Sequence, residues 1–143
     1  MKSHIVTIFL FSSIFLASCK RQFESINYGH EGCAHCKMTI MDKRFAAEIV
    51  TSKGRAIKFD DFGCLLKWVK NENFQDNRAL IFVANFNNPG SSFLDARKAV
   101  FVHNEEYRSP MSGNLAATAS QEEAQKLNLG SHSEILTWIS LNK

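Results

Sequence analysis

The chain has 143 residues, and its 17 Lys and Arg against 14 Asp and Glu give a formal net charge of +3 at pH 7. An excess this mild does not indicate the basic patch that nucleic acid binding requires, so we exclude nucleic acid as a partner. The length suits one domain of ordinary size, or two small lobes that share a core. With 12 phenylalanines, that core is predicted to be rich in aromatic rings.

Residues 1–18 are typical of a cleaved secretory signal. Lys2 precedes an apolar run of roughly 13 residues, which is shorter than the 20 or so that a membrane-spanning helix needs. The run ends in Leu16-Ala17-Ser18-Cys19, which resembles the bacterial lipobox, whose cysteine is lipidated and becomes the first mature residue. We therefore expect a lipid anchor on Cys19 and a location in the cell envelope, facing the periplasm or the outside. An ordinary signal with an incidental cysteine, or an uncleaved anchor, is the alternative.

Residues 19–32 comprise the lipidated cysteine and a predicted tether. The segment from Lys20 to Gly32 is polar, with three apolar members, Phe23, Ile26 and Tyr28. Few apolar side chains leave little to bury, so we expect this segment to link the membrane to a folded domain.

Residues 33–90 are predicted to form a first lobe. Apolar residues cluster in 45–50 and alternate with polar ones in 55–59, and both patterns favour strands. The apolar run 79–84 is typical of a buried strand. Asp60-Asp61 offers an N-cap and a negative first turn to a helix between these strands. That helix has apolar residues at helical spacing, namely Phe62, Leu65, Leu66 and Val69.

Residues 91–143 are predicted to form a second lobe with the same order. Strands are expected at 99–103 and 115–119, and the capping box at Ser120 to Glu123 opens a helix that runs through Leu127 and is closed by Gly130. Residues 134–139 are predicted to form a strand, with a terminal helix as the alternative. Both lobes therefore follow the order strand, strand, helix, strand, and we predict an α+β fold built as a pseudo-repeat.

The stretch Cys33-Ala34-His35-Cys36-Lys37-Met38 concentrates two thiols, an imidazole and a thioether. A Cys-x-x-Cys pair can be a redox dithiol, half of a zinc site, a structural disulfide or a soft-metal site. The redox form needs a strand before it and a helix after it, whereas a polar tether precedes this pair. Structural zinc needs four ligands, and the sequence has no second Cys-x-x-Cys. Met38 favours Cu(I), because a thioether forms no disulfide and remains a ligand in an oxidising compartment.

Other candidate ligands lie further along the chain. Met111 lies in a turn-rich loop between Pro110 and Gly113, where core filling does not explain it, so we expect folding to bring it to the cysteine pair. Cys64 suits core packing better than metal binding, and His35 and His103 suit solvated or hydrogen-bonded roles. Nothing indicates an enzyme, because no nucleophile has a base and adjacent aspartates on a helix start suit capping.

The ordered set of motifs resembles a known family. Cys33-x-x-Cys36-x-Met38, then Phe59-Asp60-Asp61-x-Gly63-Cys64, then Pro110-Met111-Ser112-Gly113, all after a lipobox, is similar to the NosL family of nitrous oxide reductase accessory lipoproteins. The resemblance implies a membrane-anchored Cu(I) chaperone that delivers copper to an ABC-type transporter complex or to another copper protein. It also implies two small lobes, in a fold distantly similar to that of organomercury lyase.

The resemblance carries over to individual residues. Cys33, Cys36 and Met38 would be the metal ligands of the first motif, and Met111 the matching methionine of the second lobe. This chain departs from the family at Lys37, where a glycine often stands between Cys and Met, and the lysine adds bulk and positive charge beside the site. We expect a low-coordinate Cu(I) that passes to a partner by ligand exchange.

Overall fold

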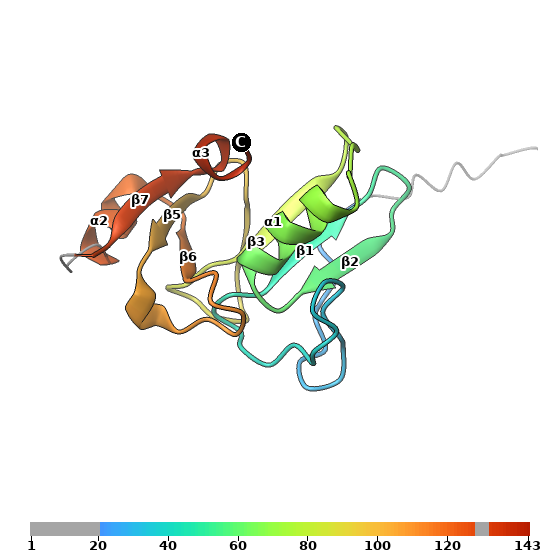
Figure 1. The fold of residues 1–143 in the computed structure, drawn as a ribbon, viewed down its shortest axis with the longest axis horizontal. Helices are drawn as coiled ribbons and strands as arrows, with labels where there is room; N and C mark the ends of the chain where they lie inside the picture. Colours follow the sequence, from blue (N-terminus) through green and yellow to red (C-terminus); the bar gives the residue numbers. More distant parts are fainter. Residues whose placement is uncertain (1–20, 128–131) are drawn as a thin grey trace, which may run out of the picture.

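The computed structural model describes residues 21–127 and 132–143, so Cys19, the signal segment and Gly130 lie outside the described residues. Two antiparallel sheets stand side by side (Figure 1). The first sheet has the strand order β2-β1-β3-β4 and the second has the order β6-β5-β7. The strands of the first sheet are β1 (Ala47–Val50), β2 (Ala56–Phe59), β3 (Leu80–Ala84) and β4 (Phe93–Asp95). Those of the second are β5 (Val100–His103), β6 (Leu115–Thr118) and β7 (Glu134–Thr137).

The helices complete the predicted pseudo-repeat. They are α1 (Phe62–Asn71), α2 (Gln121–Leu127) and α3 (Trp138–Leu141), with a short 3₁₀ turn at Glu105–Tyr107. In each lobe the first strand lies in the middle of its sheet, with the second strand on one side and the strand after the helix on the other. The α+β fold with a strand-strand-helix-strand order in both lobes is therefore confirmed. Within the described ranges, no helix has the length and apolar character that crossing a membrane requires.

The structure differs from the sequence prediction at two strands. β4 was not predicted, because Phe93–Asp95 is too short to show a period; it pairs with β3 from Phe82 to Ala84. The last predicted strand is divided, since β7 ends at Thr137 and α3 begins at Trp138. The predicted strand and the alternative terminal helix therefore both occur, one after the other.

The two lobes share one core around α1. The helix lies across one face of the first sheet and packs on β1 and β2 (Figure 1). At its start the Phe62 ring stacks on Phe101 of the second sheet, with ring centroids 4.6 Å apart, and meets Trp138 edge-on at 6.3 Å. The backbone N–H of Phe86 also donates to the carbonyl of Ala117, at 2.9 Å. Aromatic packing of this kind makes the orientation of the lobes specific.

Residues 21–32, predicted to be a polar tether, lie against the first sheet. The Phe23 ring stacks on Phe93 with centroids 3.9 Å apart, and Ile26 is buried in the core. The buried ammonium of Lys58 on β2 forms ion pairs with Glu24, at 2.9 Å, and Glu31, at 2.8 Å. Apolar contacts of Phe23, Ile26 and Tyr28 and the two ion pairs with Lys58 thus attach this polar segment to the first sheet.

Glu48 is a fully buried carboxylate on the central strand β1, paired in register with Lys58. Its Oε1 accepts a hydrogen bond from the N–H of Glu24 at 2.8 Å, and its Oε2 has no hydrogen-bond partner among the described residues. Burial raises the pKa of Glu48 to about 7, and the charges of Glu24 and Glu31 oppose its ionisation while Lys58 favours it. The folded protein therefore holds this proton more tightly than the unfolded chain does.

A pH dependence of stability follows from Glu48. Because its pKa rises from an ordinary 4.5 to about 7 on folding, the free energy of unfolding should fall as pH increases across that window. The full loss is up to about 3 kcal/mol and is complete above the folded pKa. We expect Glu48→Gln to remove this decline. In urea unfolding, the free energy of unfolding of the variant should therefore rise relative to that of the wild type between pH 4.5 and pH 8. A difference between the two proteins that stays constant across this range would contradict the assignment.

Candidate metal centre

The cysteine motif forms a tight loop between two bridged backbone segments. Gly32 and Thr39 form an antiparallel bridge, the N–H of Cys33 donates to the carbonyl of Met38 at 2.8 Å, and the N–H of Lys37 donates to the carbonyl of Cys33 at 3.0 Å. The loop therefore holds Cys33 and Cys36 on one turn. No helix follows Cys36, so neither thiol lies at a helix N-terminus, where the dipole stabilises a thiolate.

Lys37 occupies the position in this loop that favours glycine. Its φ is 67°, in the left-handed region, where an L side chain costs about 1–2 kcal/mol. The Lys37 side chain folds back and its Nζ donates to the carbonyl of Ala34 at 2.6 Å. The Lys37 ammonium is thus held at a backbone carbonyl of the loop.

The loop is attached to the end of β2, which brings it to the start of α1. The N–H of Ala34 donates to the carbonyl of Lys58 at 2.8 Å. Two residues later the chain reaches Asp60, and four residues further on Cys64 lies in the first turn of α1. The donor atoms of Cys33, Cys36, Asp60 and Cys64 all lie within 4.8 Å of one another. We call these four residues the thiol–carboxylate cluster.

The cluster is mostly buried, and burial keeps its inner thiols protonated in the absence of metal. Burial raises the pKa of Cys33 to about 11, and burial together with the neighbouring Cys33 raises the pKa of Cys64 further. Cys36 is half-buried, and its Sγ lies 3.6 Å from both carboxylate oxygens of Asp60. All three cysteines are free thiols. A metal entering the cluster must therefore displace thiol protons, which makes its binding pH-dependent.

Asp61 connects the start of α1 to the loop of the second lobe that carries Met111. Its buried carboxylate caps the helix by accepting the N–H of Gly63 at 2.5 Å. The same carboxylate accepts the N–H of Gly113 at 3.2 Å, the N–H of Met111 at 3.4 Å and the hydroxyl of Ser109. The two predicted motifs of the different lobes are thus joined at one carboxylate.

The glycines on either side of Asp61 allow this close approach. A Cβ on Gly63 would lie 2.9 Å from the Cα of Gly113, and a Cβ on Gly113 would lie 3.0 Å from the Cα of Gly63 and would overlap the Asp61 carboxylate. Both contacts involve backbone, which cannot move aside cheaply. The two glycines are therefore required for the lobes to meet at this point.

The predicted ligands take different places around the cluster. Cys33 and Cys36 belong to it, whereas Met38 is 57% exposed on the motif loop and Met111 is half-buried against the core. Among the described residues, no histidine joins the cluster: His35 lies on the loop and His103 ends β5 in the second sheet.

Two members of the cluster were not predicted as ligands. Sequence analysis assigned Cys64 to the core and both aspartates to helix capping. Asp61 does cap α1, but Asp60 points its carboxylate at the Cys36 thiol. The local sequence signal is Cys64, which lies four residues after Asp60. No spacing rule connects Asp60 with Cys36, because the two are 24 residues apart in the sequence.

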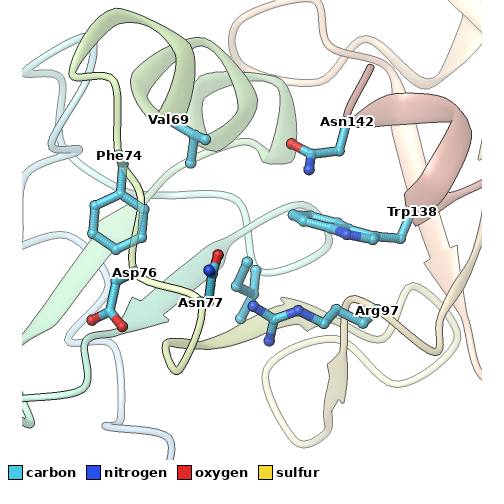
Figure 2. A pocket seen from close by; sticks show the side chains of 8 residues that line it. Val69, Phe74, Asp76, Asn77, Arg97, Trp138 and Asn142 are labelled. Atoms are coloured by element: carbon cyan, nitrogen blue, oxygen red, sulfur yellow. The ribbon is translucent and has the colours of Figure 1, made fainter.

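A separate cavity of about 250 Å³ lies between α1 and α3 and contains no sulfur donor (Figure 2). Trp138 forms one wall with the Arg97 guanidinium beneath it, 5.9 Å from the ring centroid. The carboxylate of Asp76 there already accepts the N–H groups of Ser52, at 2.6 Å, and Arg78, at 3.1 Å. This cavity is therefore not a candidate metal site.

These observations define a two-lobed α+β protein with a candidate metal centre of three thiols and a carboxylate at the junction of its lobes. A sequence profile of the NosL family matches residues 26–139, so the chain belongs to the NosL family. Among solved structures, the crystal structure of the copper chaperone NosL from Shewanella denitrificans has the same fold, with a TM-score of 0.72 and 17% sequence identity. The match covers 84% of this chain and 95% of that one. No curated protein matches the chain.

The hydrogen bonds that Asp61 accepts from both lobes should contribute to the stability of the fold. Asp61→Ala removes the acceptor of three N–H groups and one hydroxyl at a buried position, so the free energy of unfolding should fall by about 2–4 kcal/mol. The matched control is Asp95→Ala, which removes a half-exposed carboxylate that accepts one backbone N–H, from Arg97, and should cost less than about 1 kcal/mol. Urea unfolding at pH 7 measures both. Equal losses would show that Asp61 does not hold the lobes together.

Proposed function

We propose that this protein is a copper chaperone that binds Cu(I) at the thiol–carboxylate cluster and passes it on. The cluster is the observation that carries the proposal, because soft thiolate sulfurs select Cu(I) over harder ions. Membership of the NosL family and the fold shared with a copper chaperone support the same role. The role is non-catalytic.

The exposure of the donors suits transfer by ligand exchange. Cys36 is half-buried and Met38, two residues on, is mostly exposed, while Cys33 and Cys64 are buried. A Cu(I) held by Cys33 and Cys36 of the cluster and by the exposed Met38 is open on its Met38 side to attack by a partner's ligands. Met111 on the adjacent lobe is the further thioether that we assign to it. Complete burial of the ion would make release slow.

The thiol–disulfide oxidoreductase alternative has less support. A reactive cysteine needs a lowered pKa, whereas burial raises the pKa of Cys33 to about 11. The motif is followed by an extended segment that bridges back to Gly32 and not by a helix. The local structure therefore lacks both features that make a Cys-x-x-Cys pair a good redox dithiol.

The place of action and the recipient are part of the proposal. The lipobox-like sequence before Cys19 supports a lipid anchor in the cell envelope, with the domain facing the periplasm or the outside. The recipient that we propose is an ABC-type transporter complex that matures nitrous oxide reductase, or another extracytoplasmic copper protein.

A Cu(I) titration tests the metal and its ligands. The reduced full chain in detergent, titrated anaerobically against a chromophoric Cu(I) chelator, should bind one ion. Mutation of a residue that only supports a metal ligand typically lowers the metal affinity 10- to 100-fold. Cys36→Ser removes a direct ligand, so it should lower the Cu(I) affinity by on the order of 100-fold or more. Met38→Leu should lower it by about 10-fold or more on the same comparison.

Met41→Leu is the matched control for the thioether. Met41 lies three residues after Met38 and is 67% exposed, so its loss should leave the affinity unchanged. An equal response of Met38→Leu and Met41→Leu would remove Met38 from the site. Full retention of binding in Cys36→Ser would contradict the copper proposal.

The anchor is tested separately through Cys19→Ser. Expressed in a bacterial host, the wild type should fractionate with membranes and partition into the detergent phase, because two or more acyl chains give stable anchoring. Cys19→Ser should lose both properties, and Cys36→Ser, a cysteine of the folded domain, should retain them. Membrane association that persists in Cys19→Ser would rule out the lipidated cysteine as the anchor.

A further inference from the structure

The chain between the proposed lipid anchor and the attached part of the fold is short. Cys19 lies two positions before Arg21, and from Arg21 onward the segment runs along the first sheet, where the N–H of Glu24 donates to the carboxylate of Glu48 at 2.8 Å. Two residues span about 7 Å at most, even when fully extended. A lipid on Cys19 therefore holds the surface around Arg21 close to the headgroups of the membrane.

The surface around Arg21 carries four exposed cations, namely Arg21, Lys53, Arg55 and Arg78. The Nη1 of Arg21 donates to the carbonyl of Arg78 at 2.6 Å, which places the segment beside the start of β3. Lys53 and Arg55 belong to the turn between β1 and β2, which is closed by the hydrogen bond from the N–H of Thr51 to the carbonyl of Arg55, at 2.9 Å. We call these four residues the basic face.

The carboxylates close to the basic face are already engaged. Asp76 accepts the N–H of Ser52 at 2.6 Å and the N–H of Arg78 at 3.1 Å, so it joins the turn to the start of β3. Glu24 is ion-paired with the buried Lys58 at 2.9 Å. The basic face therefore keeps an excess of positive charge that no acidic side chain nearby neutralises in full.

An open hollow of about 330 Å³ separates Arg21 from Lys53. Phe23 and Val50 also line it, so apolar surface lies between the two cations. A phospholipid headgroup presents a phosphate above an apolar chain, and this combination of charged rim and apolar lining is complementary to it.

We propose that the basic face docks on an anionic phospholipid surface, with a headgroup phosphate between Arg21 and Lys53. The proposal rests on the proposed function for the anchor at Cys19, and it adds a fixed orientation of the domain on the membrane. Each Lys or Arg near an anionic surface strengthens the attraction by about 5-fold. This attraction falls off within a Debye length of about 8 Å, and the two-residue link keeps the basic face within that range.

This orientation directs the candidate metal centre away from the membrane. The β1–β2 turn and the C-terminal end of α1 lie at the outer end of the first lobe (Figure 1), whereas the thiol–carboxylate cluster lies where β2 ends and α1 begins. The 10 residues of α1 span about 15 Å, which separates the two ends. The exposed Met38 is thus presented to a partner and not to the lipid.

Lysine modification on vesicles tests the orientation. The full chain is inserted from detergent into preformed vesicles of phosphatidylcholine, alone or mixed with phosphatidylglycerol, and treated with a membrane-impermeant amine reagent. Mass spectrometry should show Lys53 reacting slower by on the order of 10-fold or more on the anionic vesicles. The rate at Lys126, which is 71% exposed on α2 of the second lobe, should be unchanged. Equal rates at Lys53 on the two kinds of vesicle would overturn the proposal.

A pair of arginine variants tests the electrostatic origin of this protection. Arg78→Gln removes one charge of the basic face and should reduce the protection of Lys53 by about 5-fold. Arg108→Gln is the matched control, because it removes an exposed arginine of the second lobe, and it should leave the protection unchanged. Salt at about 1 M should abolish the protection in the wild type. An equal response to the two variants would contradict a role for the basic face.

Flotation of the same vesicles separates the basic face from the anchor. Protein that floats with phosphatidylcholine alone is anchored through its lipid, because a zwitterionic surface attracts the basic face little. Flotation there without protection of Lys53 on anionic vesicles would overturn the basic face and leave the anchor standing. Flotation with anionic vesicles alone would support the basic face and contradict the anchor, and flotation with neither would overturn both.

Discussion

The carboxylate of Asp61 accepts hydrogen bonds from both lobes, and the positions of Cys64 and Met111 depend on it. It caps α1, which fixes Cys64, and it holds the Ser109–Gly113 segment, which carries Met111. The contact is possible because Gly63 and Gly113 let the two backbones approach with no side chain between them. A single buried carboxylate with four donors thus joins the lobes at this point, beside the stacking of Phe62 on Phe101.

The metal centre combines buried donors with exposed ones, and this division has functional meaning. Cys33, Cys64 and Asp60 are enclosed by the core, where they are shielded and their thiols stay protonated without metal. Cys36 and Met38 lie toward solvent on a loop that is held by backbone hydrogen bonds. Retention of a metal favours the buried donors, and transfer favours the exposed ones. We infer that the motif loop allows one site both to retain the metal and to transfer it to a partner.

Local sequence patterns predicted most of the fold because they report local physics. The apolar period of α1, the Asp61 cap and the Ser120–Glu123 capping box each act within one turn, and Ser120 does accept the N–H of Glu123 at 3.2 Å. The path of residues 21–32 could not be predicted in this way. Their attachment depends on Lys58 and Phe93, which are distant in sequence, and their own composition is that of a linker.

The sequence by itself determined the two strand-strand-helix-strand lobes, the family, and the role of Cys33 and Cys36 as candidate ligands. The lobes follow from periodicity, the two cysteines from the spacing of one motif, and the family from the resemblance of the ordered set of motifs. Only the tertiary structure decided that Asp60 and Cys64 join the two cysteines, and that Lys37 adopts the backbone conformation typical of glycine. The reason is that a metal centre is set by convergence in space. The loop is held beside α1 by the hydrogen bond from Ala34 to β2 and by the contact of Cys36 with Asp60, and no local pattern encodes either.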